Sequence, residues 1–339
     1  MSVVDNAITA SADTPAIDVD RLSVRLSRER KTIVPVRDVS FTLGHGETLG
    51  IIGESGCGKS VTLRALIGLL PVHATVGGTV RIHGRDVTHL PFEDMRVIRG
   101  ARVGKIFQEP ATALDPVYTI GHQIIETIMA HGVRDPKAAR SRALELLELV
   151  SIPNAERRLD AYPHELSGGM RQRAMIAIAL ACRPDVLLAD EPTTALDVTI
   201  QMQVLFLLRG LQARLGMAMV FVTHDVSVAA EIADRIAVMY AGTIVETGSA
   251  EQILVEPRHP YTRGLLASRA HRLNRGHAIP IIPGSPPDPA DLPSGCAFHP
   301  RCISADLQCT TAAPDDRPLD DRRRIRCWHA NSDAFPATK

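Results

Sequence analysis

A glycine-rich loop carries the clearest chemical signal in the chain. Residues 53–60 read Gly-Glu-Ser-Gly-Cys-Gly-Lys-Ser and fit the pattern G-x-x-x-x-G-K-[ST]. Glycines let backbone N–H groups turn inward around phosphate oxygens, and a helix N-terminus adds partial positive charge. We therefore predict a nucleoside triphosphate site, in which Lys59 reaches the β- and γ-phosphates and the Ser60 hydroxyl binds Mg²⁺. The predicted nucleotide-binding residues of this loop are Gly53, Glu54, Ser55, Gly56, Cys57, Gly58, Lys59, Ser60 and Val61.

A pair of carboxylates follows a second apolar run. Residues 186–189 read Val-Leu-Leu-Ala, and Asp190 and Glu191 come next, 130 positions after Ser60. Alone, such a pair is more often the polar end of a strand than a catalytic site. After a phosphate-binding loop it matches the chemistry of triphosphate hydrolysis, in which Asp190 orients the Mg²⁺ shell and Glu191 activates the attacking water as a general base.

These groups need a scaffold that brings them to one edge. Short apolar runs at 48–52, 186–189 and 217–223 predict buried strands, and each is followed by polar or glycine residues and a helical pattern. Buried strands that alternate with helices indicate an α/β fold with a mostly parallel sheet, whose chemistry lies at the strand ends.

The first part of the chain has a different pattern. Residues 1–16 are small and polar and predict a flexible leader. Residues 17–26, with one slip of phase at Arg21, and residues 36–43 alternate apolar and polar side chains, which predicts half-exposed antiparallel strands. Residues 120–150 have a helical pattern with an apolar stripe.

Composition excludes several classes of protein. The chain has 339 residues, enough for about two domains. Lys plus Arg and Asp plus Glu number 38 each, so no net charge favours nucleic acid, and aromatic residues make up only 4%. No apolar run approaches the ~18 residues of a membrane span, and the acidic N-terminus, with Asp5 and Asp13, does not fit a secretory signal. We expect a chain that stays in the cytoplasm and reaches a membrane only through partners.

A second glycine motif narrows the class. Residues 166–170 read Leu-Ser-Gly-Gly-Met, and this segment resembles the Leu-Ser-Gly-Gly-Gln signature of the ATP-binding-cassette ATPases, with Met170 in place of Gln. In that family, Ser167, Gly168 and Gly169 would bind the γ-phosphate of an ATP held by the opposite subunit. The resemblance implies a P-loop NTPase with a RecA-like sheet core, an antiparallel β-subdomain and a helical subdomain at about 110–180.

Further residues match the same family pattern. Gln108 stands where the family has a glutamine that contacts Mg²⁺ and water, Asp197 matches the loop that crosses the dimer interface, and His224 matches a histidine that contacts the γ-phosphate. The family usually places an adenine-stacking aromatic near Arg30, and this chain has none there. The resemblance leaves Arg30 or Ile33 as candidates for that contact.

The tail narrows the resemblance further. Residues 108–120, His-Pro-Tyr at 259–261, Pro-Gly-Ser-Pro-Pro at 283–287 and residues 296–302 together look like the ATPase subunits of oligopeptide and dipeptide permeases, a class that includes nickel importers. The chain then divides into a leader at 1–16, a cassette at 17–250 and a permease-type extension at 251–339. Because prolines are dense after residue 257, we expect this extension to be a separate small module without a core of its own.

Four cysteines gather in the extension. Five, six and seventeen residues separate Cys296, Cys302, Cys309 and Cys327, and no C-x₂-C pair is present. The resemblance supports a [4Fe–4S] cluster on these thiolates. A zinc site and free thiols stay open as alternatives, and His299 and His329 keep mixed coordination open.

The resemblance implies a function and a set of partners. We expect an ATPase at the cytoplasmic face of the cell membrane that drives import of di- or oligopeptides, bound peripherally to two transmembrane permease subunits. A second, homologous ATPase subunit and an exported substrate-binding protein are expected to complete the transporter. An importer of nickel or another small solute, and a redox-regulated cassette without a transport role, are the alternatives. A single cassette without long heptad arrays argues against ribosome-bound and DNA-repair cassettes.

Overall fold

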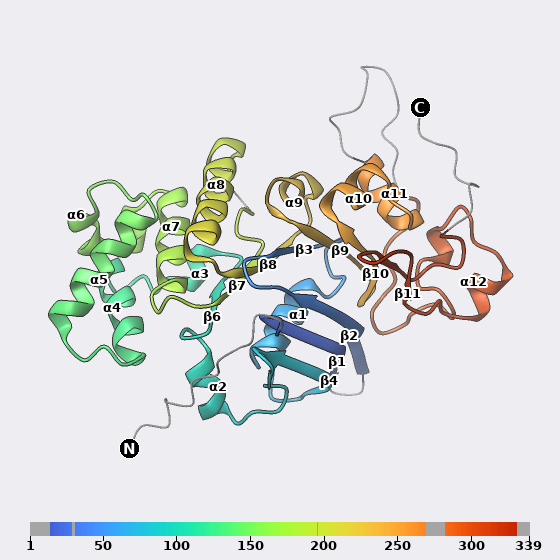
Figure 1. Ribbon diagram of the computed structural model, residues 1–339, viewed down its shortest axis with the longest axis horizontal. Coiled ribbons are helices and arrows are strands. Elements are labelled where there is room, and N and C mark those ends of the chain that lie inside the picture. Colours follow the sequence, from blue (N-terminus) through green and yellow to red (C-terminus); the bar gives the residue numbers. More distant parts are fainter. Residues whose placement is uncertain (1–13, 29–30, 195, 269–281, 331–339) are drawn as a thin grey trace.

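The computed structural model describes residues 14–28, 31–194, 196–268 and 282–330. A large sheet runs through the middle of the molecule, and a small sheet lies against one of its faces (Figure 1). A group of helices forms one end of the molecule, and the segment that contains α12 (Leu307–Thr311) forms the other (Figure 1). Of the leader predicted at 1–16, residues 1–13 lie outside the described residues.

The large sheet has eight described strands in the order β11-β12-β10-β9-β3-β8-β7-β6. The five strands β9, β3, β8, β7 and β6 are parallel to one another in that order. Strand β10 pairs antiparallel with β9. All residues of β3, β7 and β8 are buried, which explains their continuous apolar sequence and confirms the three predicted strands. The strands are β3 (Thr48–Ile52), β6 (Val103–Ile106), β7 (Val186–Asp190), β8 (Ala218–Thr223), β9 (Arg235–Tyr240), β10 (Thr243–Ser249), β11 (Arg317–Pro318) and β12 (Arg324–Ile325).

The small sheet is antiparallel, in the order β2-β1-β4-β5. The register of β1 shifts against both neighbours around Arg21, whose φ of 47° lies in the left-handed region. This bulge is the physical cause of the slip of phase in the sequence. Helix α1 packs between the two sheets, and α2 follows the small sheet (Figure 1). The elements are β1 (Ile17–Arg28), β2 (Lys31–Leu43), α1 (Lys59–Leu66), β4 (Ala74–Ile82), β5 (Arg85–Asp86) and α2 (Phe92–Ile98).

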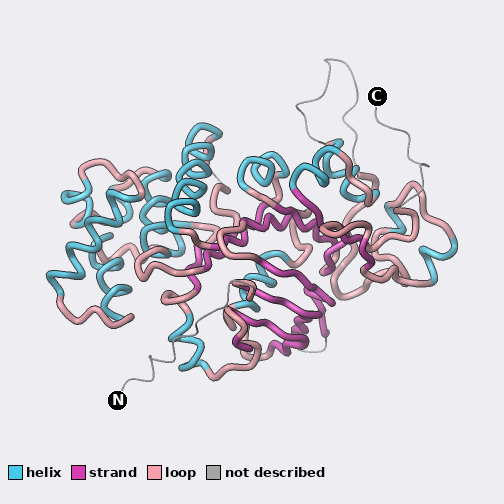
Figure 2. Tube along the Cα trace, viewed as in Figure 1, coloured by secondary structure: helices cyan, strands magenta, loops and turns pink. Residues whose placement is uncertain are grey.

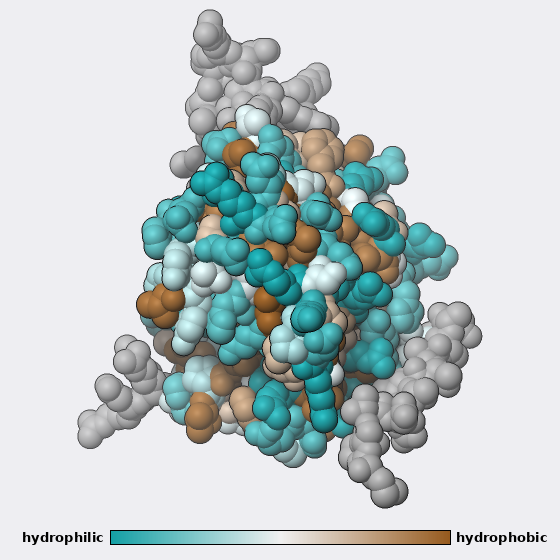
Figure 3. Space-filling view, turned by 90° about the vertical axis from the view of Figure 1, so that its left-hand side faces the viewer, coloured by the Kyte–Doolittle hydropathy of each residue, from teal (hydrophilic) through white to brown (hydrophobic). Residues whose placement is uncertain are grey.

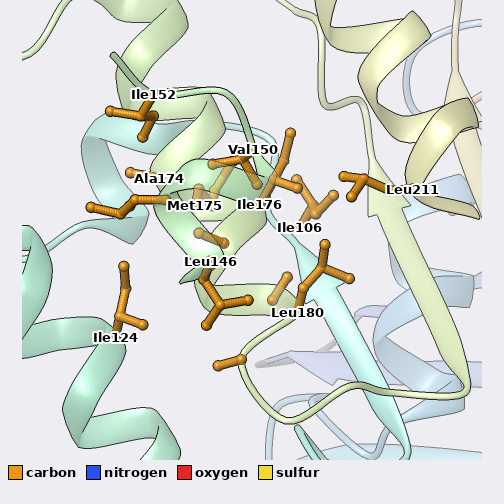
Figure 4. Packing of buried hydrophobic residues seen from close by; sticks show 14 of the residues in the cluster. Ile106, Ile124, Leu146, Val150, Ile152, Ala174, Met175, Ile176, Leu180 and Leu211 are labelled. Atoms are coloured by element: carbon orange, nitrogen blue, oxygen red, sulfur yellow. The ribbon is translucent and has the colours of Figure 1, made fainter. Parts of the chain in front are cut away.

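The helical end of the molecule has its own apolar core. Ile124, Leu146 and Met175 come from three different helices and point toward one another (Figure 4). The helical pattern at 120–150 divides into two helices, because Gly132 adopts a positive φ and Asp135 begins a new helix as its N-cap. The elements are α3 (Pro110–Ala113), α4 (Ile120–Ala130), α5 (Pro136–Leu149), α6 (Ala155–Leu159), a 3₁₀ turn at Pro163–Glu165 and α7 (Gly168–Ala179).

Helices also cover the face of the large sheet that lies opposite the small sheet. Strand β7 leads to α8, and β8 leads to α9, so both helices follow strand ends that carry predicted site residues (Figures 1 and 2). The helices on this face are α8 (Val198–Leu215), α9 (Val226–Ile232), α10 (Ala250–Val255) and α11 (Pro260–Ala267).

The C-terminal extension is continuous with the cassette, contrary to the separate module expected from its prolines. Strand β12 pairs with β10, so the extension lengthens the large sheet. Tyr261 and Phe298 of the extension share a buried apolar cluster with Tyr240 of β9. Prolines do not prevent this packing because Pro260 lies at the first position of α11, where a backbone N–H has no helical partner. The remaining elements are a 3₁₀ turn at His299–Arg301 and α12 (Leu307–Thr311).

The surface at the helical end mixes hydrophilic side chains with scattered hydrophobic ones (Figure 3). In the part of the chain that the structure describes, no helix has the length and apolar character needed to cross a lipid bilayer.

Candidate nucleotide-binding and hydrolysis site

The loop between β3 and α1 has a backbone that requires glycine. Gly53 and Gly58 have φ values of 158° and 108°. A Cβ at Gly53 would lie 2.2 Å from the Met239 carbonyl oxygen, and one at Gly58 would lie 2.2 Å from the Pro35 carbonyl oxygen. Neighbouring backbone therefore confines the loop on two sides, and only glycine fits at these positions.

Lys59 lies at the start of α1 and is only 4% exposed. Its Nζ donates hydrogen bonds to the carbonyl oxygens of Gly53, at 2.8 Å, and Glu54, at 3.0 Å. It also lies 3.9 Å from Oε1 of Glu191. The ammonium is thus held inside the loop and beside the catalytic carboxylate predicted from the sequence.

Ser60 and Asp190 meet as the sequence predicts. The Ser60 hydroxyl donates to Oδ1 of Asp190 at 2.7 Å, and Asp190 is buried at the end of β7. A hydroxyl and a carboxylate side by side are hard oxygen donors, so this pair fits Mg²⁺. Lys105 of β6 lies 3.8 Å from Oδ2 of Asp190, and burial lowers the pKa of Lys105 against the opposing effect of that carboxylate. Sequence reasoning missed Lys105, which no motif marks.

Three side chains contact one carboxylate oxygen of Glu191. Its Oε2 accepts hydrogen bonds from the Thr194 hydroxyl, at 3.0 Å, and from Nε2 of Gln108, at 3.4 Å. Nδ1 of His224 lies 3.1 Å from the same oxygen. Because an ionised carboxylate can only accept, Nδ1 carries the proton in this contact.

Topology explains this convergence. Gln108, Glu191 and His224 follow β6, β7 and β8, which are adjacent and parallel, so their carboxyl ends share one edge of the sheet. Thr194 was missed by sequence reasoning; its place three residues after Glu191 is the only signal that marks it.

The predicted second anion site lies on two helix N-termini. Ser167 is the N-cap of α7 and accepts a hydrogen bond from the Met170 backbone N–H at 3.3 Å. Asp197 is the N-cap of α8 and accepts from the Ile200 backbone N–H at 3.0 Å. Both caps are exposed, and no hydrogen bond or ion pair among the described residues joins either one to residues 53–61.

The extension contacts the phosphate loop directly, which the sequence did not predict. The Glu54 carboxylate accepts two hydrogen bonds from Arg301, and the Glu54 backbone N–H donates to the Tyr261 hydroxyl at 2.9 Å. The N–H of Glu54, expected among the phosphate ligands, is therefore directed toward the extension. A cleft of about 120 Å³ lies between the loop, β2 and the prolines of the extension. Of the two residues considered for adenine, Ile33 is partly buried in β2, and Arg30 lies outside the described residues.

The four cysteines of the extension lie close to one another as free thiols. The Cys296 backbone N–H donates to the Cys309 carbonyl oxygen at 2.8 Å, and Sγ of Cys309 lies 3.6 Å from Nε2 of His329. Burial raises the pKa of all four thiols, that of Cys327 to about 11. Ligand atoms of Asp306, Cys309 and His329 all lie within 4.8 Å of one another.

Comparisons with known proteins agree with this geometry. The ABC transporter family model matches residues 36–194, and the model for the oligopeptide/dipeptide transporter C-terminal region matches residues 245–309. The chain is 45% identical over 314 residues to the dipeptide transport ATP-binding protein of Bacillus subtilis, covering 92% of this chain and 94% of that protein. It is 43% identical over 314 residues to the oligopeptide transport ATP-binding protein of Haemophilus influenzae, covering 93% and 97%.

Solved structures give the same result for the cassette. A dimeric ATP-binding cassette in a post-hydrolysis state bound to ADP and phosphate is similar to this chain, with a TM-score of 0.62 and 29% identity. That similarity covers 69% of this chain and 98% of the solved one.

Proposed function

The chain belongs to the ATP-binding-cassette ATPases of the oligopeptide and dipeptide transporter family, and on that premise we propose how its residues divide the work of peptide import. It is the ATP-hydrolysing subunit of an importer that takes up di- and oligopeptides through membrane permease partners. The observation that carries the mechanism is the convergence of Lys59, Glu191 and His224 at the edge of the sheet.

In the proposed site, Glu191 is the general base. Its carboxylate accepts the proton of the attacking water, and the amide of Gln108 orients that water. His224 and Lys59 stabilise the negative charge that develops on the γ-phosphate. Gln108 and His224 both contact Oε2 of Glu191, and this supports the roles because the three side chains meet at one carboxylate oxygen.

Mg²⁺ belongs to this site through oxygen donors. Ser60 and Gln108 are the proposed ligands, and Asp190 holds the shell through the Ser60 hydroxyl. The ion neutralises phosphate charge when it is bound.

Two cassettes are proposed to enclose two ATP molecules. The exposed caps at Ser167 and Asp197 lie on helix N-termini, which favour anions, and among the described residues neither cap is hydrogen-bonded to the phosphate loop of its own chain. We infer that Ser167, Gly168 and Gly169 bind the γ-phosphate held by the other subunit. That subunit is proposed to be a second, homologous ATPase.

The substitution Glu191→Gln tests this function. The amide cannot accept the proton, so ATP hydrolysis is expected to fall by at least about a hundredfold while Mg-ATP still binds. The variant is expected to accumulate as a closed dimer in Mg-ATP, measured by gel filtration with the companion subunits present. A variant that hydrolyses ATP at the wild-type rate would show that another group is the base.

We propose that the four cysteines bind a [4Fe–4S] cluster. The grouping of four thiols in an irregular segment, two of them buried and two partly buried, supports this donor set. The second candidate is a mixed metal site, for which the short distances among Asp306, Cys309 and His329 are the supporting observation. Iron and sulfide analysis of anaerobically purified protein distinguishes them: four of each per chain supports the cluster, and zinc without sulfide supports the mixed site.

The partners and location are proposed together. We place the chain at the cytoplasmic face of the cell membrane, bound peripherally to two permease subunits, with an exported binding protein supplying the peptide. Val117, Tyr118, Met129 and Val133 are exposed apolar side chains of the helical end and are suited to contact the permeases. Nickel or another small solute is the alternative cargo. Uptake of labelled dipeptide and of nickel by cells lacking this chain separates the two.

A further inference from the structure

Arg301 of the extension reaches the phosphate loop with both ends of its guanidinium. Nη1 donates to Oε2 of Glu54 at 2.8 Å, and Nη2 donates to Oε1 at 3.0 Å. This is the bidentate arrangement that gives arginine and carboxylate their strongest pairing. The two residues are 247 positions apart in the chain, so the contact exists only because the extension folds back onto the cassette.

The extension fixes the position of this guanidinium. Arg301 is only 6% exposed, and its Nε donates to the Pro283 carbonyl oxygen at 2.9 Å. Nη1 also lies 3.3 Å from the Tyr240 hydroxyl, and the rings of Tyr240 and Phe298 lie within 6.0 Å of Cζ. Hydrogen bonding to Glu54 raises the pKa of Arg301, so the pair stays ionised. The arginine is therefore held in place before any nucleotide arrives.

Tyr261 holds the same loop residue through the backbone. Its hydroxyl accepts the hydrogen bond of the Glu54 N–H, and its ring is fully buried. Burial raises the pKa of this phenol well above its ordinary value, so it remains neutral. The carbonyl of Glu54 in turn accepts from Lys59. All the polar groups of Glu54 thus have partners, and one of those partners is the lysine that the triphosphate needs.

The negative charge of Glu54 affects how well the loop can bind phosphate. Glu54 places a carboxylate in a loop that binds a polyanion, and a partly buried carboxylate there repels phosphate unless a cation compensates it. In the described structure the cation that contacts this carboxylate is Arg301.

We propose that Arg301 is a positioning residue of the ATP site, supplied by the extension. It neutralises Glu54 and holds residues 53–57 in the phosphate-binding conformation, so the extension sets the affinity of the cassette for ATP. This inference rests on the proposed function of the loop. It assigns to the extension a role in nucleotide binding in addition to the proposed metal site.

Two substitutions of similar size separate charge from packing. Arg301→Met keeps the bulk against Tyr240 and Phe298 but leaves Glu54 uncompensated, and is expected to raise the Kd for Mg-ATP about tenfold or more. Arg301→Lys keeps the charge and is expected to raise it by less than about threefold. The measurement is equilibrium binding of Mg-ATP to the full chain, together with kcat at saturating ATP, which is expected to stay within about twofold in both variants.

A second substitution and a change of salt test the electrostatic role. Adding Glu54→Gln to Arg301→Met removes the uncompensated charge and is expected to recover most of the lost affinity. Raising the salt concentration is expected to narrow the difference in Kd between Arg301→Met and the wild type, because screening weakens the repulsion. A purely structural role of Arg301 would produce neither result.

A matched control uses another ion pair between extension and cassette. Arg326 donates to the carboxylate and to the carbonyl oxygen of Asp38 in β2, and among the described residues neither partner is hydrogen-bonded to the phosphate loop. Arg326→Met is expected to leave the Kd for Mg-ATP within about twofold of the wild type. The iron content of each variant is measured in parallel, so a loss of the metal site is recognised.

The outcomes are distinct. If Arg301→Met binds Mg-ATP as tightly as the wild type, or as tightly as Arg301→Lys, the inference is wrong while the ATPase function stands. If the double variant binds no better than Arg301→Met, the charge argument is wrong. If the wild-type chain itself binds no Mg-ATP, the proposed function is wrong as well.

Discussion

At the scale of single residues, the carboxylate of Glu191 has a dense set of neighbours. Thr194, Gln108 and His224 all contact Oε2. The φ of Glu191 is 46°, in the left-handed region that few residues adopt, so its backbone turns sharply at the end of β7. Orientation of the base therefore depends on both the turn and the hydroxyl of Thr194.

Thr194→Val tests that orientation. Valine has nearly the same shape as threonine but cannot donate a hydrogen bond. The Glu191 carboxylate therefore loses one charge-assisted hydrogen bond. We expect kcat for ATP hydrolysis to fall about tenfold, with the Kd for Mg-ATP unchanged. Thr194→Ser is the control and should retain most of the activity. An equal loss in both variants would show that the hydroxyl is not the important group.

His259 predicts a pH dependence of stability. Its ring is fully buried and its Nδ1 accepts from the Tyr261 backbone N–H at 3.0 Å. Burial lowers the pKa of His259 to about 4, although the Glu246 carboxylate partly opposes this. Since the unfolded pKa is higher, the unfolded chain binds the proton first, and stability is lost as pH falls from about 6.5 toward 4.

The substitution His259→Asn measures this contribution. Asparagine keeps an acceptor at the N-cap of α11 but does not titrate. Between pH 7 and pH 5 the wild type is expected to lose about 2 kcal/mol more of its free energy of unfolding than the variant does. Urea unfolding of both proteins at the two pH values provides the comparison, and equal losses would exclude His259 as the cause.

Motifs predicted some of these residues and not others. The loop residues and the pair at 190–191 carry signals in their own sequence, and the structure brings Lys59, Ser60, Asp190 and Glu191 together. Lys105 lies in no motif, and the tail motifs that contain Tyr261 and Arg301 indicate the transporter family without indicating a contact with the phosphate loop. Their contacts arise from tertiary packing of distant segments, which spacing along the chain does not encode.

At the scale of elements, α7 and α8 begin side by side. A Cβ at Gly169 would lie 2.8 Å from Cγ2 of Ile200, so glycine permits a close approach of the two helices. Ser167 and Asp197 cap these helices. The two caps therefore form one surface, which the proposed dimer uses.

Ser167→Ala separates capping from nucleotide binding. Loss of the cap is expected to lower the free energy of unfolding by about 1 kcal/mol. In the Glu191→Gln background it is also expected to prevent the ATP-dependent dimer, measured by gel filtration. Ser249→Ala, which removes the cap of α10 far from this surface, should cost similar stability and leave the dimer intact. Dimers of normal strength in Ser167→Ala would contradict the assignment.

The sequence predicts the long buried strands but not the two short strands of the extension. Buried strands such as β3, β7 and β8 have continuous apolar runs, and the bulge at Arg21 interrupts the alternation of β1. Strands β11 and β12 have two residues each and no pattern of their own. They form because the edge of β10 offers unpaired backbone groups.

At the scale of the whole molecule, the cassette and the extension share a core. Phe298 is 4% exposed and contacts the rings of Tyr240 and Tyr261. Buried Glu246 of β10 also pairs with Arg323 of the extension. These contacts indicate that the two parts unfold together.

Phe298→Ala tests this cooperation. Removing the ring from the shared cluster is expected to lower the free energy of unfolding by about 3–5 kcal/mol. Denaturant unfolding is expected to remain a single transition at a lower midpoint, with fluorescence and circular dichroism coinciding. A separate early transition for the extension would show that it is an independent module.

The pairing of β12 with β10 limits which segments can be removed, or exchanged between related ATPases in a chimaera. A chain cut after β10 would present the bare edge of that strand to other molecules, which promotes aggregation. A tail transplanted from another transporter would need a compatible edge, a fitting aromatic pocket and a partner for Glu54. Chains that end after β10 are thus expected to precipitate, whereas chimaeras that exchange β9, β10 and the tail as one block should remain in solution.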